Sequence, residues 1–378
     1  MMKAKKYIGF ASCLIGSWLI TSSGALAASL SASLLKVKQD AEAKGYVFHT
    51  SHDEIVDRAK KEGKLKVLSS QEPRAIKAIT EAFKKKYPFI NVSAEEINGL
   101  ETYQRILQEM KAGLANSWDV NYVAFDFYNE YLPYQKKFDI LGMAEQGVLQ
   151  MAPKVVDPVN RHVVALQSNM QVIVYNYNKE LISAAKLPDT WEGFLKPEFS
   201  GRKFALDIRP KLLAALVPIW GMEKTVDVGK KLAAQKPIWF RGEQRLMISM
   251  LAGEMALCLG PNYKSFKLVQ EQKDPRNILG FKVINPVPAR LTEAEGILNT
   301  ASNPYAGLLW REFQASPEGQ KILDDVDLAA SILVPGSVHE RITRGRPLSV
   351  LAWEHYPKVG DYEKAIVKAY GFPTVDKK

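Results

Sequence analysis

Seven side chains that follow the ends of predicted strands are of types that bind small charged ligands. They are Ser69, Ser70, Gln71, Asp126, Arg209, Tyr263 and Lys264. In open α/β sheets a ligand binds beyond the carboxyl ends of the strands, where loops converge and helix N-termini point at the crevice. The sequence therefore predicts one binding crevice formed by these residues.

The chemistry of this set favours an anion. The hydroxyls and backbone N–H groups of Ser69 and Ser70 would stand at the N-terminus of the next helix, where an anion is stabilised. Pro210 suits a first helical position, so Arg209 would lie beside a positive helix end and could hold a carboxylate or phosphate through two hydrogen bonds. Simpler alternatives stay open: Ser70 as a helix cap, Asp126 as a solvated acid beside core aromatics, and Arg209 as a surface residue.

Tyr263 and Lys264 complete the predicted crevice. A helix-like run from Glu243 to Leu251 leads into an apolar strand from Met255 to Leu259, and the chain then turns on Gly260-Pro261-Asn262. This turn would carry both side chains past the carboxyl end of the strand. Taken alone, the same pattern also fits an ordinary connection with a surface tyrosine.

Motifs for catalysis are missing from the sequence. It contains no Gly-x-Ser-x-Gly elbow, no pair of histidines at zinc-binding spacing and no Gly-Lys-Ser/Thr phosphate loop. The five histidines are scattered, and Cys258 lies in an apolar strand where a buried, inert thiol is expected. We therefore expect a binding protein, with no catalytic residues and no cofactor, rather than an enzyme.

Alternating strands and helices must position these candidates. Strands are predicted over 65–68, 90–94 and 119–125, with amphipathic helices over 73–86 and 103–114 between them. This alternation is typical of a mainly parallel sheet covered by helices, and it predicts an α/β fold class.

A long extended passage in mid-chain indicates a crossing between two domains. Residues 162–166 and 171–175 have the pattern of two extended segments, and the Asn285-Pro286-Val287-Pro288 breaker marks the return crossing. The prediction is two α/β lobes joined by a two-crossing hinge. Lobe one comprises residues 51–168 and 286–378, and lobe two comprises residues 169–285.

The first 27 residues have the pattern of a secretory signal peptide. Three lysines precede an apolar run from Tyr7 to Ile20, and Ala25-Leu26-Ala27 suits cleavage. We expect cleavage after Ala27, an N-terminal extension over 28–50 and a soluble periplasmic protein. No later apolar run is long enough to span a bilayer. An uncleaved membrane anchor is the alternative.

The net charge limits the expected partners. Removal of the signal peptide lowers the formal charge from +10 to +7, because it takes three lysines and no acid. No basic patch with interleaved aromatic residues accompanies this charge, so nucleic acid is not an expected partner. The charge suits an anionic ligand, and we expect a monomer.

Short matches to one known family are spread over residues 50–375. They include Ala59-Lys60-Lys61-Glu62-Gly63-Lys64-Leu65-Lys66-Val67, Ala82-Phe83-Lys84-Lys85-Lys86-Tyr87-Pro88, Pro188-Asp189-Thr190-Trp191, Leu195-Lys196-Pro197, Gly253-Glu254 and Ser316-Pro317-Glu318-Gly319-Gln320. With these matches the chain resembles the bacterial ABC-transporter solute-binding proteins of the iron(III)-binding group, extracellular solute-binding family 1. The resemblance implies a type II periplasmic-binding-protein fold, a ligand clamped between two lobes, and an ABC permease in the inner membrane as partner.

The resemblance also bears on the ligand. Iron binders of this family use adjacent tyrosines shortly after the Gly-Glu pair, and the matching positions here are Tyr263 and Lys264. An ammonium group cannot ligate ferric iron and opposes its charge. We therefore predict a small anionic solute such as a phosphonate, a phosphate ester or a carboxylate. Ferric iron with Tyr263 as a metal ligand is the alternative, and an exported enzyme or a receptor-linked sensor module on the same fold is an alternative from another class.

Overall fold

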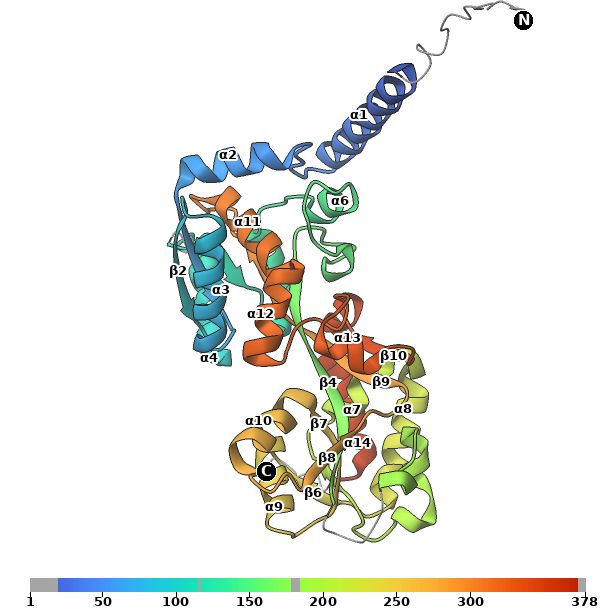
Figure 1. Cartoon of the computed structure of the whole chain (residues 1–378). Helices are drawn as coiled ribbons and strands as arrows, with labels where there is room; N and C mark the ends of the chain where they lie inside the picture. Colours follow the sequence, from blue (N-terminus) through green and yellow to red (C-terminus); the bar gives the residue numbers. More distant parts are fainter. Residues whose placement is uncertain (1–19, 115–116, 178–183, 373–378) are drawn as a thin grey trace, which may run out of the picture.

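Two α/β lobes are stacked end to end and connected by long strands (Figure 1). The computed structural model describes residues 20–114, 117–177 and 184–372. The strands follow one another across the sheet in the order β2-β1-β3-β9-β4-β7-β5-β6, with β10 paired to β9 and β8 paired to β4. This architecture confirms the predicted α/β fold with two lobes.

Three parallel strands carry the first candidate residues in lobe one. β1 (Lys64–Ser69) pairs with β2 (Asn91–Glu96) on one side and β3 (Val120–Tyr122) on the other. The helix after β1 begins with Pro73 at its first position and buries Ile76, Ile79 and Phe83 at helical spacing, as the sequence predicts. The helices of this lobe are α2 (His52–Glu62), α3 (Pro73–Lys86), α4 (Leu100–Lys111), α5 (Tyr128–Tyr131), α6 (Ile140–Glu145), α11 (Pro304–Ala315) and α12 (Pro317–Asp327).

In lobe two, each of three parallel strands leads to a helix. β5 (Ala205–Asp207) pairs with β6 (Ile238–Phe240) and with β7 (Leu257–Asn262). The strand ends and the helix N-termini therefore share one edge of the sheet. The helices are α7 (Lys211–Ala214), α8 (Val217–Ala234), α9 (Glu243–Leu251) and α10 (Tyr263–Lys273), and β8 (Leu279–Lys282) pairs antiparallel with β4.

The predicted turn at Gly260-Pro261-Asn262 is instead the end of strand β7. Gly260 has φ +86°, and a Cβ there would lie 2.8 Å from Cβ of Leu212, so glycine lets β7 approach the first turn of α7. The Asn262 side chain then caps α10 by accepting a hydrogen bond of 2.7 Å from the Ser265 N–H. The cap starts the helix directly at Tyr263.

Two long antiparallel strands, here called the hinge ribbon, run through both lobes. They are β4 (Val164–Asn176) and β9 (Val287–Ile297), which pair from Val164 opposite Glu295 to Met170 opposite Ala289. β4 then continues beside β7 and β8. The expected pair of extended segments in mid-chain is therefore one continuous strand, because buried residues on both faces support it along its length.

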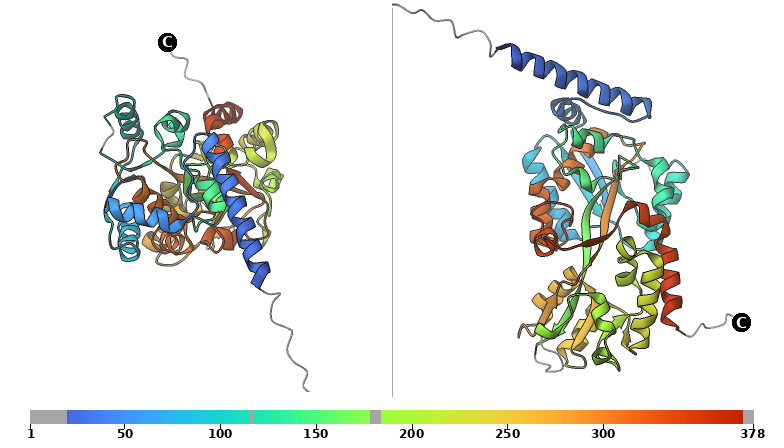
Figure 2. Two further views of the ribbon diagram at one scale, coloured as in Figure 1. Left: turned by 90° about the horizontal axis from the view of Figure 1, so that it is seen from above. Right: turned by 90° about the vertical axis from the view of Figure 1, so that its right-hand side faces the viewer.

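The last part of the chain crosses between the lobes once more. After α13 (Val338–Thr343), β10 (Leu348–Leu351) pairs in parallel with β9, and α14 (Val359–Tyr370) then packs on α8 in lobe two (Figure 2). Tyr370 lies 4.9 Å from the ring of Trp239 on β6. The prediction that all of 286–378 belongs to lobe one is therefore wrong for α14, whose apolar face fits the core of lobe two.

At the N-terminal end, α1 (Ile20–Ala43) projects away from lobe one (Figure 1). The helix runs past the predicted cleavage site after Ala27 and forms most of the predicted extension over 28–50. Most of the predicted signal segment, residues 1–19, lies outside the described residues. Within the described part of the chain no helix has both the length and the apolar character that a membrane span requires.

Candidate ligand-binding site

A cavity of about 230 Å³ lies between the two lobes and against the hinge ribbon. Tyr122 and Phe125 line it from lobe one, at the end of β3. Lys211, Glu243 and Asn262 line it from lobe two. A cavity reached by both lobes is the place where a bound ligand can hold them together.

The hinge ribbon supplies a polar wall for this cavity. Asn169 lies directly opposite Arg290 in the β4–β9 ladder, and Gln171 and Thr292 each follow two positions along. Side chains at a spacing of two share a face of a strand, so all four line the cavity together. The ribbon therefore brings one cation and three neutral polar groups to a point that both lobes share.

Arg290 is the cation of this wall. Its guanidinium lies 5.6 Å from the ring centre of Phe125 and 5.9 Å from that of Tyr356, a cation–π arrangement that fixes its plane. Its Nε is buried and has no hydrogen-bond partner. Among the described residues no carboxylate forms an ion pair with it. A half-buried arginine whose buried Nε has no partner is suited to a carboxylate or phosphate.

Consecutive strand ends in lobe two each contribute one charged or polar group. Lys211 is the first residue of α7 after β5, Glu243 is the first residue of α9 after β6, and Asn262 ends β7. Glu243 Oε2 accepts hydrogen bonds from the Asn262 backbone N–H at 3.1 Å and from its Nδ2 at 2.6 Å. Glu363 of α14 completes this side of the cavity. In lobe two the cavity is therefore lined by residues at the ends of the strands.

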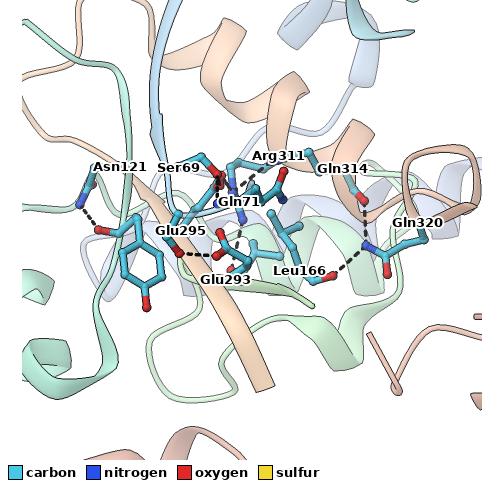
Figure 3. A network of polar contacts seen from close by, with 12 residues as sticks. Ser69, Gln71, Asn121, Leu166, Glu293, Glu295, Arg311, Gln314 and Gln320 are labelled. Carbon is cyan, nitrogen blue, oxygen red and sulfur yellow. Dashed lines mark hydrogen bonds and ion pairs between the residues drawn. The ribbon is translucent and has the colours of Figure 1, made fainter. Parts of the chain in front are cut away.

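Ser69, Ser70 and Gln71 follow strand β1 and face a network inside lobe one, in which Figure 3 shows Ser69 and Gln71. Ser69 Oγ donates to Glu295 Oε1 at 3.2 Å and accepts from the Gln71 backbone N–H at 3.2 Å. Ser70 Oγ donates to Glu293. None of the three residues is among those that line the cavity.

Two buried acids of β9 and one buried arginine of α11 form the centre of this network. Glu295 pairs with Arg311, and burial lowers the pKa of Arg311 to about 9. Glu293 is buried as well, and burial raises its pKa to about 7. These residues are not predicted from the sequence, because an isolated acid in a segment without a clear pattern gives no signal of its burial.

Lys264 crosses from lobe two to lobe one. Its Nζ lies 2.8 Å from Asp327 Oδ1 at the end of α12 and 3.0 Å from Glu72 Oε1 before α3. The residue therefore lies between the lobes, as predicted, but its charge is already paired with two carboxylates. Its part in ligand binding stays a prediction.

The remaining candidates lie in other surroundings. Tyr263 is buried, with its ring 5.2 Å from Phe281 and 5.7 Å from His339, and burial raises its pKa. Arg209 is held by Asp207 at 2.6 Å and does not line the cavity. The side chain of Asp126 lies outside the described residues. Among the described residues no group of three or more His, Cys, Asp or Glu side chains is arranged to hold a metal ion.

The sequence comparison with protein families decides the class. Residues 133–358, more than half of the chain, match the model of the bacterial extracellular solute-binding proteins. The chain belongs to this family. No curated protein matches the sequence.

Solved structures of low sequence identity share the fold of this solute-binding protein. One is iron-bound HitA from Pseudomonas aeruginosa, with 18% identity, a TM-score of 0.55 and coverage of 81% of this chain and 99% of that chain. Another is Mannheimia haemolytica ferric iron-binding protein A in an open conformation, with 16% identity, a TM-score of 0.61 and coverage of 82% and 98%. A third is the Atu4243–GABA receptor, with 13% identity, a TM-score of 0.59 and coverage of 83% and 100%.

The cavity residues of this solute-binding protein were missed for a specific reason. The prolines at 286 and 288 indicate a strand breaker, so the sequence does not predict β9 or draw attention to Arg290. A signal was present, since Ala289-Arg290-Leu291-Thr292 alternates between apolar and polar residues as a half-buried strand does.

Proposed function

We propose that this chain is the periplasmic solute-binding component of an ABC importer and that it captures a small organic anion in the cavity between its lobes. The observation that carries the proposal is Arg290, a half-buried cation with a buried, unpartnered Nε in a cavity lined by both lobes. The cavity volume of about 230 Å³ lies below the range of about 300–1,000 Å³ typical for drug-sized ligands, which supports a small solute.

The position of Arg290 couples binding to lobe closure. The residue is on the hinge ribbon, so an anion held there meets Tyr122 from lobe one and Lys211 from lobe two only when the lobes are close. A ligand that gains contacts in the closed state shifts the lobes toward that state. Phe125 and Tyr356 hold the guanidinium in place before the ligand arrives, which reduces the entropy lost on binding.

The test is a thermal-shift and calorimetric screen of refolded, ligand-free protein with carboxylates, phosphate esters and phosphonates. A ligand at a hundredfold excess over its Kd stabilises the protein by about 2.7 kcal/mol. Arg290→Gln is expected to weaken binding about 10- to 100-fold, because a hydrogen bond to a charged group contributes about 1.5–3 kcal/mol. Arg276→Gln, at an exposed position of lobe two, is the matched control. Equal affinity in both variants would remove Arg290 from the site.

Ferric iron is the second candidate, and the similarity in fold to ferric-binding proteins favours it. The Atu4243–GABA receptor has a comparable TM-score, so the fold itself accommodates either kind of ligand. A ferric salt that raises the melting temperature and produces a phenolate charge-transfer colour, while organic anions do neither, would favour iron. Loss of that colour in Tyr263→Phe would assign the phenolate.

Transport can be separated from the other classes by function. We expect the ligand-loaded protein to stimulate ATP hydrolysis by a reconstituted ABC permease complex. Chemical conversion of the bound ligand would instead indicate an enzyme, and activation of a receptor kinase would indicate a sensor.

A further inference from the structure

We infer that the solute is a zwitterion, an amino-substituted carboxylate or phosphonate, rather than a simple anion. The inference rests on the proposed function and adds the chemical class of the solute. Its basis is that the cavity carries charges of both signs. Arg290 and Lys211 are cationic, and Glu243 and Glu363 are anionic.

The two acids belong to different elements and are held differently. Asn262 binds Glu243 Oε2 twice, which fixes the direction of that carboxylate and leaves Oε1 to a ligand. Glu363 of α14 is half-buried and forms no ion pair with any described residue. The nearby Arg209 interacts with both carboxylates at longer range, but its guanidinium is held by Asp207 at 2.6 Å and forms no ion pair with either of them.

Gln171 is an independent observation on the opposite wall. It is 5% exposed, it lines the cavity from β4, and its Oε1 is buried with no hydrogen-bond partner. A buried acceptor without a donor costs about 1–3 kcal/mol. An ammonium group has three donors and could serve this oxygen, whereas an acid group without an amine has no donor to offer when ionised.

The energetics of lobe closure favour a ligand that carries both a positive and a negative charge. When the lobes close, each charge in the cavity loses water and must find a partner. A simple anion pairs with Arg290, but it brings no donor to Glu243 and Glu363, for which Lys211 is the other cation in the cavity, and it adds a like charge to their surroundings. A zwitterion places its acid group on Arg290 and its ammonium group near the carboxylates and Gln171. The cavity therefore selects for an amine in addition to an acid.

The experiment compares ligands that differ in one group. The probes are β-alanine, propanoate and propylamine, then 4-aminobutanoate, butanoate and butylamine, and then 2-aminoethylphosphonate and ethylphosphonate. We expect at least one amino acid or aminophosphonate to bind about tenfold or more tightly than its partner without the amine, since one good ionic hydrogen bond contributes about that factor.

Two variants locate the recognition. Glu363→Gln is expected to weaken binding of the probe with the amine and to leave the partner without the amine bound at least as tightly, because a negative charge near the anion is removed. Arg290→Gln is expected to weaken both. Glu198→Gln, at an exposed position, is the matched control.

The outcomes separate this inference from the proposed function. If the probes without an amine bind as tightly as those with one, and Arg290→Gln still weakens them, the zwitterion is wrong and the anion site stands. If only ferric salts bind, or if no probe binds, both fail. Because the comparison of probes is made on the unaltered protein, it does not depend on the folding of any variant.

Discussion

Lys264 Nζ lies 2.8 Å from Asp327 Oδ1, and this ion pair connects lobe two to lobe one. Asp327 is 1% exposed and ends α12, where the negative end of the helix disfavours a carboxylate. Lys264 is the second residue of α10, where the positive end of the helix disfavours an ammonium. The charge of each residue is unfavourable at the end of its own helix and favourable at the end of the other helix. The pair therefore stabilises the close arrangement of the lobes.

Lys264→Gln is expected to destabilise the protein by about 1–3 kcal/mol. The change leaves the buried Asp327 with Arg74 as its cationic partner, at the longer distance of 3.5 Å. In the absence of ligand, we also expect a larger fraction of the variant molecules to have their lobes apart. Small-angle scattering and a fluorescence distance between labelled lobes measure that fraction.

The control for this prediction is Lys273→Gln, at the exposed end of α10. A double-mutant cycle with Asp327→Asn isolates the interaction between the two residues. If the effects of the two single variants simply add, the ion pair does not stabilise the closed form.

Glu293→Gln should change how stability depends on pH. The folded pKa of about 7 lies above the usual 4.5, so the stability linked to this proton is present at low pH and is lost as pH rises through 7. Ser70, Asp327, Lys264 and Arg311 are the groups that act on it. As pH rises from 5 to 8, the melting temperature of the variant minus that of the unaltered protein is expected to increase by a few degrees. A constant difference across this range would contradict a buried, protonated Glu293.

Gly260→Ala should weaken ligand binding and lower stability together. The positive φ and the contact with Leu212 both oppose a Cβ, at a cost of about 1–3 kcal/mol, and the resulting shift would move Lys211 and Asn262 at the cavity. Calorimetry and thermal unfolding measure the two effects. Gly360→Ala is the control, because nothing lies within 4 Å of its Cβ position and it is inside a helix.

Ile366→Ala tests the placement of α14 on lobe two. Ile366 is fully buried against α8, and we expect a loss of about 2–5 kcal/mol in the free energy of unfolding. The neighbouring Val367 is 36% exposed, and its change to alanine should alter stability by less than about 0.5 kcal/mol. Similar effects of the two changes in urea unfolding would argue against this packing.

The main features of the fold could be predicted because they depend on local patterns. Alternating strands and helices identified both lobes, and Pro73 marked the start of α3. The full length of β9 could not be predicted from local patterns. Two prolines stand at its start, where β10 pairs with it in parallel, and only the tertiary pairing with β4 shows that the segment is a strand.

The candidates predicted in lobe two lie one or two residues away from residues that line the cavity. Arg209 was selected where Lys211 lines the cavity, and Tyr263 was selected where Asn262 does. The rule that ligands bind at strand ends locates the loop, but the direction of each side chain depends on the position at which the helix begins. The cap formed by Asn262 turns Tyr263 toward Phe281 instead.

The order in which the strands occur along the chain has a consequence for folding. β3 finds its neighbour β9 only after the whole central part of lobe two has been synthesised, so the sheet of lobe one keeps an unpaired edge until then. Pairing between such distant segments is slow, because a large loop must close before the contacts form. In a newly made chain the sheet of lobe one would therefore remain incomplete, with an edge prone to aggregation, until β9 emerges and pairs with β3.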